Sequence, residues 1–532
     1  MSAAPWWRVS VGYEVYLRSF SDSSGDGIGD LPGLRERLGH LAWLGVDLLW
    51  VTPFFRSPMH DQGYDISDYR DVDPTYGTLA DFDSLVADAH ELGIRVLVDL
   101  IPNHTSVEHP WFQESRSARD NPFRDYYIWR DPARGGGPPN NWVSVFGGPA
   151  WTLDETTGQY WLHLFLSEQP DLNWRDERVA RELDGSMRFW LERGADGFRI
   201  DVADGLVKHP DLPDNPVAAA TWVGPPAGIA SDWGLLEHVY DVGQPEVREI
   251  HRRWRALVEP YGALLVGEIG LADPDALALY VNDQDGLHLT FWFEPMEIEW
   301  DAATIRKSLS AAAAASDHLA WVQGSHDRPR AATRFGGGDV GRARSLALAV
   351  LMLGLPGVPF VYQGEELGLV DGLVLPEEAQ DPISTRAGEH GLGRDGCRTP
   401  MPWEPGPGLG FTTAEQPWLP FGGRSAADTA AVQRDDPDSI LQRFRRLLRL
   451  RRTLRWESVP LEWIAEQGPL VAYRRGAVLV AANCGDEPAA LELPPGTWAL
   501  TYATSEPEAR EANGSVELAP ADAVVLGQSR LS

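Results

Sequence analysis

The sequence is poor in cysteine and in long apolar runs, and each shortage excludes a class of protein. Its 532 residues include two cysteines, Cys397 and Cys484, which cannot form a disulfide framework and lack the spacing of a metal site. No apolar run approaches the roughly 18 to 20 residues that a membrane-spanning helix needs. The first residues, MSAAPWWRVS, show no charged segment followed by an apolar one, as a secretory signal would. We therefore expect a soluble protein of the cytoplasm.

Basic residues are also scarce. The chain has 46 Lys and Arg against 78 Asp and Glu, which gives a formal net charge of -32. Nucleic acids and anionic membranes attract clustered Lys and Arg, so this charge argues against both as partners, whereas a neutral substrate is not repelled. The only lysines are Lys208 and Lys307, which we interpret as coding bias.

What the sequence does contain is a repeated alternation of strand-like and helix-like patterns. No glycine-rich dinucleotide fingerprint follows the first strand-like run. Eight alternations favour an α/β fold of the (β/α)8 TIM-barrel type over an open doubly wound sheet, and place functional residues just past the carboxyl ends of the strands. The eight runs cover residues 11–20, 47–53, 95–103, 197–203, 264–270, 287–293, 318–327 and 358–366.

Two connections are too long to be turns, and the end of the chain changes character. The segment after the third strand contains GGGPPNNWVSVFGGPAW, and residues 206–243 after the fourth carry Trp222, Trp233 and His238; both are expected to overhang the barrel mouth. After a helical stretch at 439–454, short alternating runs predict antiparallel strands. The predicted domains are a barrel over 1–103 and 174–456, an inserted domain over 104–173, and a C-terminal β-sandwich over 457–532.

A charged pair stands inside the fourth predicted strand, GADGFRIDVADG. Side chains two apart in a strand share one face, so Arg199 and Asp201 point the same way while Ile200 points to the other face. A structural ion pair is the commoner explanation of an isolated Arg-x-Asp. Whether Arg199 and Asp201 form a structural ion pair or part of a functional site therefore depends on the residues at the ends of the other predicted strands.

Polar side chains gather at four of the predicted strand ends. Carboxylates that converge without phosphate-binding or clustered metal-binding residues suit acid/base and nucleophilic chemistry on a neutral polar substrate. Two histidines on different strands, without a third close ligand, make a poor metal site for a hydrolase. The residues are Asp99, Asn103 and His104 on the third strand, Arg199 and Asp201 on the fourth, Glu268 on the fifth, and His326 and Asp327 on the seventh.

Cleavage of a glycosidic bond is the leading candidate reaction. With retention of configuration it needs an ionised nucleophile and a protonated acid about 5 Å apart. We expect Arg199 to lower the pKa of Asp201 and so keep it ready to attack. Glu268, with Val266 and Ile269 beside it and no basic neighbour in the sequence, is the better proton donor.

These blocks resemble the four signature regions of the α-amylase family, glycoside hydrolase family 13, and in particular its α-glucosidase branch. DLIPNH, GFRID, GEIG and GSHDRPR occur in the family's order, from the first strand into the last helix, although the family usually has Asn where Ser325 stands. The resemblance implies that Asp201 is the nucleophile, Glu268 the general acid/base, and Asp327 the carboxylate that grips ring hydroxyls. It also implies that His104 and His326 bind sugar hydroxyls, that Arg199 orders the nucleophile, and that Asp99 organises the site.

Two further blocks resemble the exo-acting members of this branch. In DQGYDISDY, the resemblance implies that Tyr64 stacks on the terminal glucose and that Asp61 holds its far hydroxyls. RDGCRTPMPW resembles the branch's late arginine motif, and we expect Arg398 to be the partner of Asp61, with Arg394 as the alternative.

The loop DSSGDGIGD places candidate oxygen ligands at alternate positions, a spacing that wraps around a hard cation such as Ca²⁺. The loop also resembles the metal loop of this branch, with Ser24 in place of the more common Asn or Asp. We therefore expect a structural Ca²⁺ and no organic cofactor; the alternative is a solvated acidic turn. The ligand candidates are Asp22, Ser24, Asp26, Ile28 and Asp30.

The residues and the resemblance together predict an exo-acting, retaining α-glucosidase. It would release α-glucose from the non-reducing end of short maltose-like oligosaccharides through a covalent β-glucosyl-enzyme. The alternatives are a transglucosylase or sugar isomerase of the same family, and a carbohydrate-binding protein without catalysis. Val202 after the nucleophile accompanies α-1,6 preference in part of the branch, whereas GFRIDVADGLVKHP resembles members that act on maltose; we favour α-1,4. The expected partners are small α-glucosides, with no nucleic acid or membrane, in a monomer or small homo-oligomer.

Overall fold

The computed structural model describes residues 5–219, 228–387, 393–453, 459–465, 468–505, 510–512 and 514–528. Within them, eight parallel strands pair in chain order and close into a barrel, which confirms the predicted fold class and all eight strand positions. The strands are β1 (Gly12–Val15), β2 (Leu48–Val51), β5 (Arg95–Leu100), β9 (Gly197–Ile200), β10 (Leu264–Gly267), β11 (Leu289–Trp292), β12 (Leu319–Trp321) and β13 (Val358–Tyr362).

The strands are short apolar runs because both of their faces are covered. Every strand residue apart from Arg95 at the start of β5 is buried, as in a parallel barrel with helices outside and packed side chains inside. The interior is filled by Trp50, Leu97, Val266 and Phe291, among others. The surrounding helices are α1 (Leu31–Leu44), α2 (Leu79–Glu91), α4 (Glu177–Glu192), α5 (Val247–Val258), α7 (Ala302–Ala315), α9 (Gly338–Leu353) and α12 (Ile440–Thr453).

The helices begin and end at residues that the sequence marks. The Asp30 side chain caps α1 by accepting from the backbone N–H of Gly33, and Gly45 ends the helix with a φ of 111°. Thr78 and Asp81 form a capping box at the start of α2. These local signals determine where α1 begins and ends and where α2 begins.

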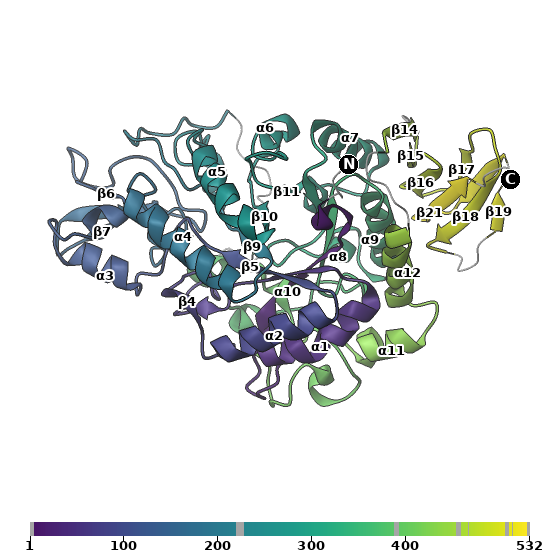
Figure 1. Cartoon of the computed structure of the whole chain (residues 1–532), viewed down its shortest axis with the longest axis horizontal. Coiled ribbons are helices and arrows are strands. Elements are labelled where there is room, and N and C mark those ends of the chain that lie inside the picture. Colours follow the sequence, from purple (N-terminus) through teal and green to yellow (C-terminus); the bar gives the residue numbers. More distant parts are fainter. Residues whose placement is uncertain are drawn as a thin grey trace.

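The segment between β5 and α4 folds as a separate small sheet at one end of the molecule (Figure 1). It contains α3 (Pro110–Ser117) and the antiparallel strands β6 (Trp129–Arg130), β8 (Gln159–Leu162) and β7 (Trp151–Asp154), in that order. His104 and Asp171 form an antiparallel bridge, so the segment leaves and re-enters the barrel at one place. Its boundaries at 104 and 173 stay predictions.

The segment that follows β9 packs against this sheet and reaches the barrel mouth. The backbone N–H of Ala230 donates to the carbonyl of Val145 at 2.8 Å. Gly228 lies so near Arg394 that a Cβ at position 228 would be 2.9 Å from the Cδ of that arginine. Trp233 stacks on His238 with ring centroids 3.5 Å apart, while Trp222 lies outside the described residues.

The chain ends in an antiparallel domain at the opposite end of the molecule, drawn in yellow in Figure 1, which confirms the predicted C-terminal β domain. No helix within the described ranges is both long and apolar enough to cross a membrane. One sheet holds β14 (Leu461–Ala465), β15 (Leu470–Arg475), β16 (Val478–Asn483), β21 (Ala523–Gln528), β18 (Trp498–Ala503) and β19 (Arg510–Ala512), and a second holds β17 (Ala489–Glu492) and β20 (Ser515–Leu518).

Candidate active site

The registers of three neighbouring strands bring the predicted catalytic groups together. Asp99 on β5 lies opposite Arg199 on β9, and Arg199 lies opposite Val266 on β10. The ladder continues one residue beyond each strand, because Asp201 N–H donates to the Leu100 carbonyl and Glu268 N–H to the Ile200 carbonyl, both at 2.9 Å. Asp201 and Glu268 therefore stand side by side at the carboxyl edge of the barrel.

The guanidinium of Arg199 donates hydrogen bonds to three carboxylates. Its Nη1 donates to Asp99 Oδ1 at 2.9 Å and to Asp201 Oδ1 at 2.6 Å, and its Nη2 donates to Glu268 Oε2 at 2.6 Å. The contact with Asp201 agrees with the shared face expected in β9. Glu268 has no basic neighbour along the chain, but the β9–β10 register places the guanidinium of Arg199 beside it. The expectation of a proton donor without a basic partner was therefore wrong.

The pKa of Asp201 also differs from the expectation. Burial is the largest influence and raises it; Arg199 lowers it as predicted, but Glu268 and Asp99 raise it again, and the result lies well above the ordinary value of an aspartate. Burial likewise raises the pKa of Asp99 to about 6 despite its contact with Arg199. The prediction considered Arg199 alone, whereas three acids in a closed space share that single cation.

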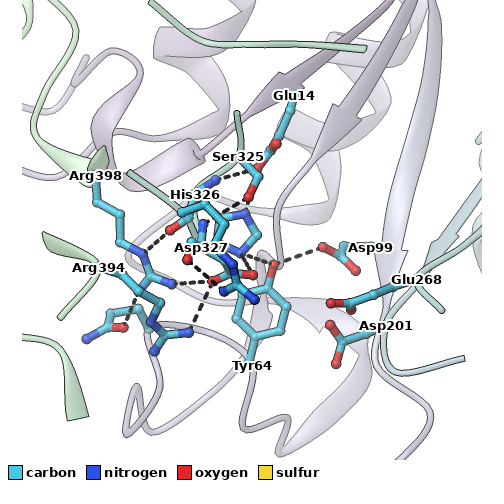
Figure 2. A network of polar contacts seen from close by, with 12 residues as sticks. Glu14, Tyr64, Asp99, Asp201, Glu268, Ser325, His326, Asp327, Arg394 and Arg398 are labelled. Carbon is cyan, nitrogen blue, oxygen red and sulfur yellow. Dashed lines mark hydrogen bonds and ion pairs between the residues drawn. The ribbon is translucent and has the colours of Figure 1, made fainter. Parts of the chain in front are cut away.

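Asp327, the third predicted catalytic acid, is held in the ionised form. Burial raises its pKa, but the cations Arg394 and Arg398 together bring it well below the usual range. Its Oδ1 accepts from Arg398 Nη2 at 2.9 Å and from Arg394 Nη1 at 3.1 Å (Figure 2). About three tenths of its side chain is exposed, so its free edge faces the mouth of the barrel.

Arg394, the predicted alternative, is the partner of Asp61, and the expectation for Arg398 was wrong. Arg394 Nη2 donates to Asp61 Oδ1 at 2.9 Å, and its Nε donates to Asp381 Oδ2 at 2.6 Å. Arg398 instead donates to Gln62 Oε1 at 3.0 Å and to Asp327. Arg394 precedes the short helix α10 (Asp395–Arg398) and Arg398 is its last residue. The orientation of α10, which the sequence does not reveal, determines which guanidinium reaches Asp61.

Tyr64 and His104 line the same wall as Asp61. The ring of Tyr64 stacks on that of His326 with centroids 5.5 Å apart, and its hydroxyl donates to Asp99 Oδ2 at 3.2 Å. His104 Nε2 lies 3.1 Å from the Tyr64 carbonyl, and burial lowers the pKa of His104 to about 4, so the ring is neutral. The structure thus brings together all the predicted sugar-binding residues around the acids; their roles toward a sugar stay predictions.

Two supporting acid and base groups were not anticipated from the sequence. Glu14, on β1, lies 2.5 Å from His326 Nδ1. Lys208, one of the two lysines, donates to Asn103 Oδ1 and pairs with Asp171 Oδ2, both at 2.7 Å, and so ties the loop after β9 to the base of the inserted segment. The inward-facing position of Glu14 in an apolar run and the rarity of lysine were the available signals.

Two departures from ordinary backbone or family pattern lie beside the acids. Val202, directly after Asp201, has a φ of 44°, in the left-handed region that β-branched residues avoid, and its N–H lies 3.2 Å from Glu268 Oε2. The hydroxyl of Ser325 accepts from the Asp327 N–H at 3.1 Å. Ser325 therefore supports the turn that carries Asp327.

The loop predicted to bind calcium is closed by its own hydrogen bonds. Asp22 accepts from the N–H groups of Gly25 and Gly27 at 2.7 and 2.8 Å, and Asp30 accepts from Ser23 Oγ at 2.8 Å. Within the part of the chain that the structure describes, no three acidic, His or Cys side chains are grouped so as to hold a metal ion. These hydrogen bonds occupy carboxylate oxygens of Asp22 and Asp30, and calcium at this loop stays a prediction.

Comparison with known proteins gives matches over nearly the whole chain. The family model described as the α-amylase catalytic domain covers residues 14–457, and a domain of unknown function, DUF3459, covers residues 456–526. The chain is 41% identical over 508 residues to a "Probable alpha-glucosidase" of Rhizobium meliloti, covering 92% of this chain and 91% of the relative. It is 38% identical over 482 residues to an oligo-1,6-glucosidase of Parageobacillus thermoglucosidasius, covering 84% of each.

Solved structures of similar sequence share the architecture. The α-glucosyl transfer enzyme XgtA superposes with a TM-score of 0.92 at 40% identity, covering 99% of this chain and all of the other. The trehalulose synthase MutB of Pseudomonas mesoacidophila superposes with a TM-score of 0.88 at 33% identity and the same coverage. With the three acids and their arginines at the barrel mouth, these similarities show that the chain belongs to the α-amylase family of glycoside hydrolases, glycoside hydrolase family 13.

Proposed function

We propose that the protein is an exo-acting, retaining α-glucosidase that releases α-glucose from the non-reducing end of short maltose-like oligosaccharides. The observation that carries the proposal is the shared contact of Asp201 and Glu268 with the guanidinium of Arg199, beside the ionised Asp327. A guanidinium that binds both carboxylates holds Asp201 and Glu268 next to each other, which suits a retaining enzyme, whose two carboxyl groups stand about 5 Å apart.

The reaction proceeds in two displacements. Asp201 attacks the anomeric carbon and forms a β-glucosyl ester, while the bond to the leaving oxygen breaks and Glu268 gives that oxygen its proton. Glu268, now ionised, removes a proton from water, which attacks the same carbon and frees Asp201 with net retention. The positive charge that develops on the ring in the transition state is stabilised by the nearby carboxylates of Asp201 and Asp327.

The exo mode is supported by the side chains that surround Asp61. Asp61, Arg394 and Asp327 are joined by hydrogen bonds of 2.9 and 3.1 Å, and Gln169 adds a contact of 3.4 Å to Asp61. A wall of this kind closes behind one sugar ring and supplies charged partners for its far hydroxyls. A terminal glucose fits such a pocket, whereas a chain that continues in both directions does not.

A second candidate is transfer of the glucosyl group to a sugar or alcohol. It is favoured by the similarity to XgtA, which is described as an α-glucosyl transfer enzyme, and to MutB, a variant of which is solved with its substrate sucrose. Both activities use the same covalent intermediate and differ in whether water or another hydroxyl resolves it. Preference for α-1,6 linkages is a third possibility, since several relatives are oligo-1,6-glucosidases.

The test is a proton NMR time course on an equimolar mixture of maltose and isomaltose, with the Asp201→Ala variant as the control. Early consumption of maltose with α-glucose as the first anomer, and no reaction in the control, supports the retaining α-1,4 activity. Earlier loss of isomaltose would move the preference to α-1,6, and new glycosidic signals would indicate transfer. If neither sugar changes, the proposed function is wrong.

A structural Ca²⁺ at residues 22–30, a cytoplasmic location and a monomeric or small homo-oligomeric state are further parts of the proposal. The alternating oxygen groups of the loop support calcium, and the two cysteines support a reducing compartment. Metal analysis of the purified protein, with thermal unfolding in calcium and in chelator, tests the first. Ultracentrifugation tests the oligomeric state.

A further inference from the structure

Glu14 is a buried acid that the two displacements do not use. Its side chain and that of His326 are each 1% exposed. Glu14 Oε1 lies 2.5 Å from His326 Nδ1 and also 3.2 Å from the backbone N–H of His326, which donates to it (Figure 2). Glu14 Oε1 therefore contacts both the ring Nδ1 and the backbone N–H of His326, the residue that precedes Asp327.

The other ring nitrogen of His326 lies between two oxygen atoms. Its Nε2 lies 2.8 Å from the Tyr64 hydroxyl and 3.4 Å from Asp327 Oδ2. The hydroxyl has one hydrogen and donates it to Asp99, whose two oxygens accept from Arg199 as well. Both neighbours of Nε2 thus present acceptors, so Nε2–H is the form that satisfies the site.

The neutral ring with its proton on Nε2 needs a donor at Nδ1. A carboxyl O–H at Glu14 Oε1 is the group that fits, because a hydroxyl oxygen donates one bond, to Nδ1, and accepts another, from the backbone N–H. Burial raises the pKa of Glu14 and lowers that of His326, and both shifts agree with a protonated Glu14 and a neutral His326. The amide of Gln cannot take the place of this carboxyl group. At the position of Oε1 an amide oxygen could accept from the backbone N–H but not donate to Nδ1, and an amide nitrogen could donate to Nδ1 but not accept from the backbone N–H.

Packing alone already fixes the plane of the His326 ring. The ring lies between Tyr16 and Tyr64, with centroid separations of 5.4 and 5.5 Å and interplanar angles of 15° and 8°. The backbone carbonyl of His326 accepts from Arg398 Nε at 2.7 Å. The role that remains for Glu14 is therefore to determine which ring nitrogen of His326 carries the proton. The charged and titratable groups around the pair are Asp99, Arg199, Asp327, Arg394 and Arg398, together with the phenols of Tyr16, Tyr64 and Tyr362 and the thiol of Cys397.

We propose that Glu14 is a positioning residue for this site: its protonated carboxyl donates to Nδ1 and holds His326 as the Nε2–H tautomer. This N–H is directed at the Tyr64 hydroxyl and Asp327 in the free protein and donates to a hydroxyl of the glucoside when one binds. The proposal rests on the proposed glucosidase function for the identity of the substrate. It adds a group on β1 that acts through His326.

The first experiment compares the parent with Glu14→Gln on p-nitrophenyl α-glucoside and its four monodeoxy forms. Glu366→Gln is the matched control, because Glu366 is an equally buried acid that accepts from the Tyr13 hydroxyl at 3.0 Å outside the site. We expect Glu14→Gln to lower kcat/KM about tenfold or more. We also expect one monodeoxy substrate that is poor for the parent to lose most of its disadvantage in Glu14→Gln, while the control keeps the parent's order.

The second measurement is independent of activity. In protein labelled with ¹⁵N-histidine, the parent should show a slowly exchanging Nε2–H of His326, assigned by its loss in His326→Asn, and Glu14→Gln should convert it to Nδ1–H. A bare Nε2 in the parent overturns the proposal, even where the variant does not fold. So does an unchanged tautomer with an unchanged order of monodeoxy substrates in Glu14→Gln. If the parent cleaves no α-glucoside, the glucosidase function fails and the histidine signals still decide the role of Glu14.

Discussion

At the scale of single residues, the site depends on one cation shared by several acids. Arg199 is 2% exposed and donates to Asp99, Asp201 and Glu268, while its guanidinium carbon lies 4.7 Å from the centre of the Trp50 ring. A planar fork reaches acids on two sides at fixed angles, and an ammonium group does not. The relative positions of Asp201 and Glu268 are therefore set by this side chain.

Arg199→Lys tests this dependence. We expect kcat on an α-glucoside to fall by about 100-fold or more, because Lys cannot hold Asp201 and Glu268 together in the geometry of attack. Arg95→Lys is the control: Arg95 is also on a barrel strand, but its head is partly exposed and pairs with Asp196 at 2.7 Å, away from the acids. The control should stay within about twofold of the parent. Equal kcat values for the two variants would contradict the role given to Arg199.

The raised pKa of Asp201 predicts a cost in stability that depends on pH. An aspartate whose pKa is higher in the folded than in the unfolded protein destabilises the fold as the pH rises past its unfolded value of about 3.9. Asp201→Asn removes the charge, so we expect the inactive variant to have a higher Tm than the parent at pH 7.

The difference in Tm should shrink as the pH falls toward the unfolded value of about 3.9, because below its raised folded-state pKa Asp201 of the parent is protonated and carries no charge to bury. Thermal unfolding of both proteins between pH 4 and pH 8 is the measurement. Asp83→Asn, at an aspartate exposed on α2, should show no such trend. A variant less stable than the parent at pH 7 would show that the contact of Asp201 with Arg199 outweighs the cost of burial.

At the scale of elements, the placement of Asp201 depends on how closely β9 approaches β10. Gly197, at the start of β9, has a φ of 148°, and a Cβ there would lie 2.0 Å from the carbonyl oxygen of Leu264 on β10. No side chain fits between the two backbones. The glycine two residues before Arg199 is therefore required for the β9–β10 spacing that joins Asp201 and Glu268.

Gly197→Ala should destabilise the protein by about 2 kcal/mol or more, since backbone rather than a flexible side chain must move, and should lower activity in the fraction that folds. Gly39→Ala is the control: Gly39 lies inside α1 with nothing within 4 Å of the added Cβ. There, alanine should raise stability by up to about 1 kcal/mol. Urea unfolding of both variants gives the comparison, and equal midpoints would refute the close-packing argument.

At the scale of the whole molecule, the C-terminal domain covers part of the barrel. Every residue from Ser345 to Leu353 on α9 is buried, as for a helix that is covered on all sides. Val471 and Tyr473 of β15 belong to the same apolar core as this helix, and the Tyr473 hydroxyl donates to the Leu351 carbonyl at 2.6 Å. The two domains therefore share one core.

A chain that ends at residue 456 should consequently lack a cover for α9 and aggregate on expression. The exposed strip would be an apolar patch of the kind that drives association. Sedimentation of the truncated and full-length proteins is the measurement, with Tyr473→Phe in the full chain as a control that removes one hydrogen bond and keeps the cover. A monomeric, active truncated protein would show that the barrel is complete without the C-terminal sheets.

The sequence by itself determined the barrel and the identity of the acids. The signals for strands, turns and helix caps, such as Thr78 and Asp81, involve only a few neighbouring positions. They can therefore be recognised in the sequence alone. The placement of Asp201, Glu268 and Asp327 followed because polar residues ending parallel strands must meet at one rim. The shared face of Arg199 and Asp201 likewise needed only the two-residue period of a strand.

Only the tertiary structure decided which groups touch and how strongly each acid holds its proton. Asp61 and Arg394 are 333 residues apart, and their contact depends on the orientation of α10 rather than on any local pattern. The same holds for Arg199 with Glu268 and for Glu14 with His326, which meet through strand register and barrel closure. The pKa of Asp201 depends on burial and on every nearby charge, and these are properties of the closed barrel mouth rather than of neighbouring residues in the chain.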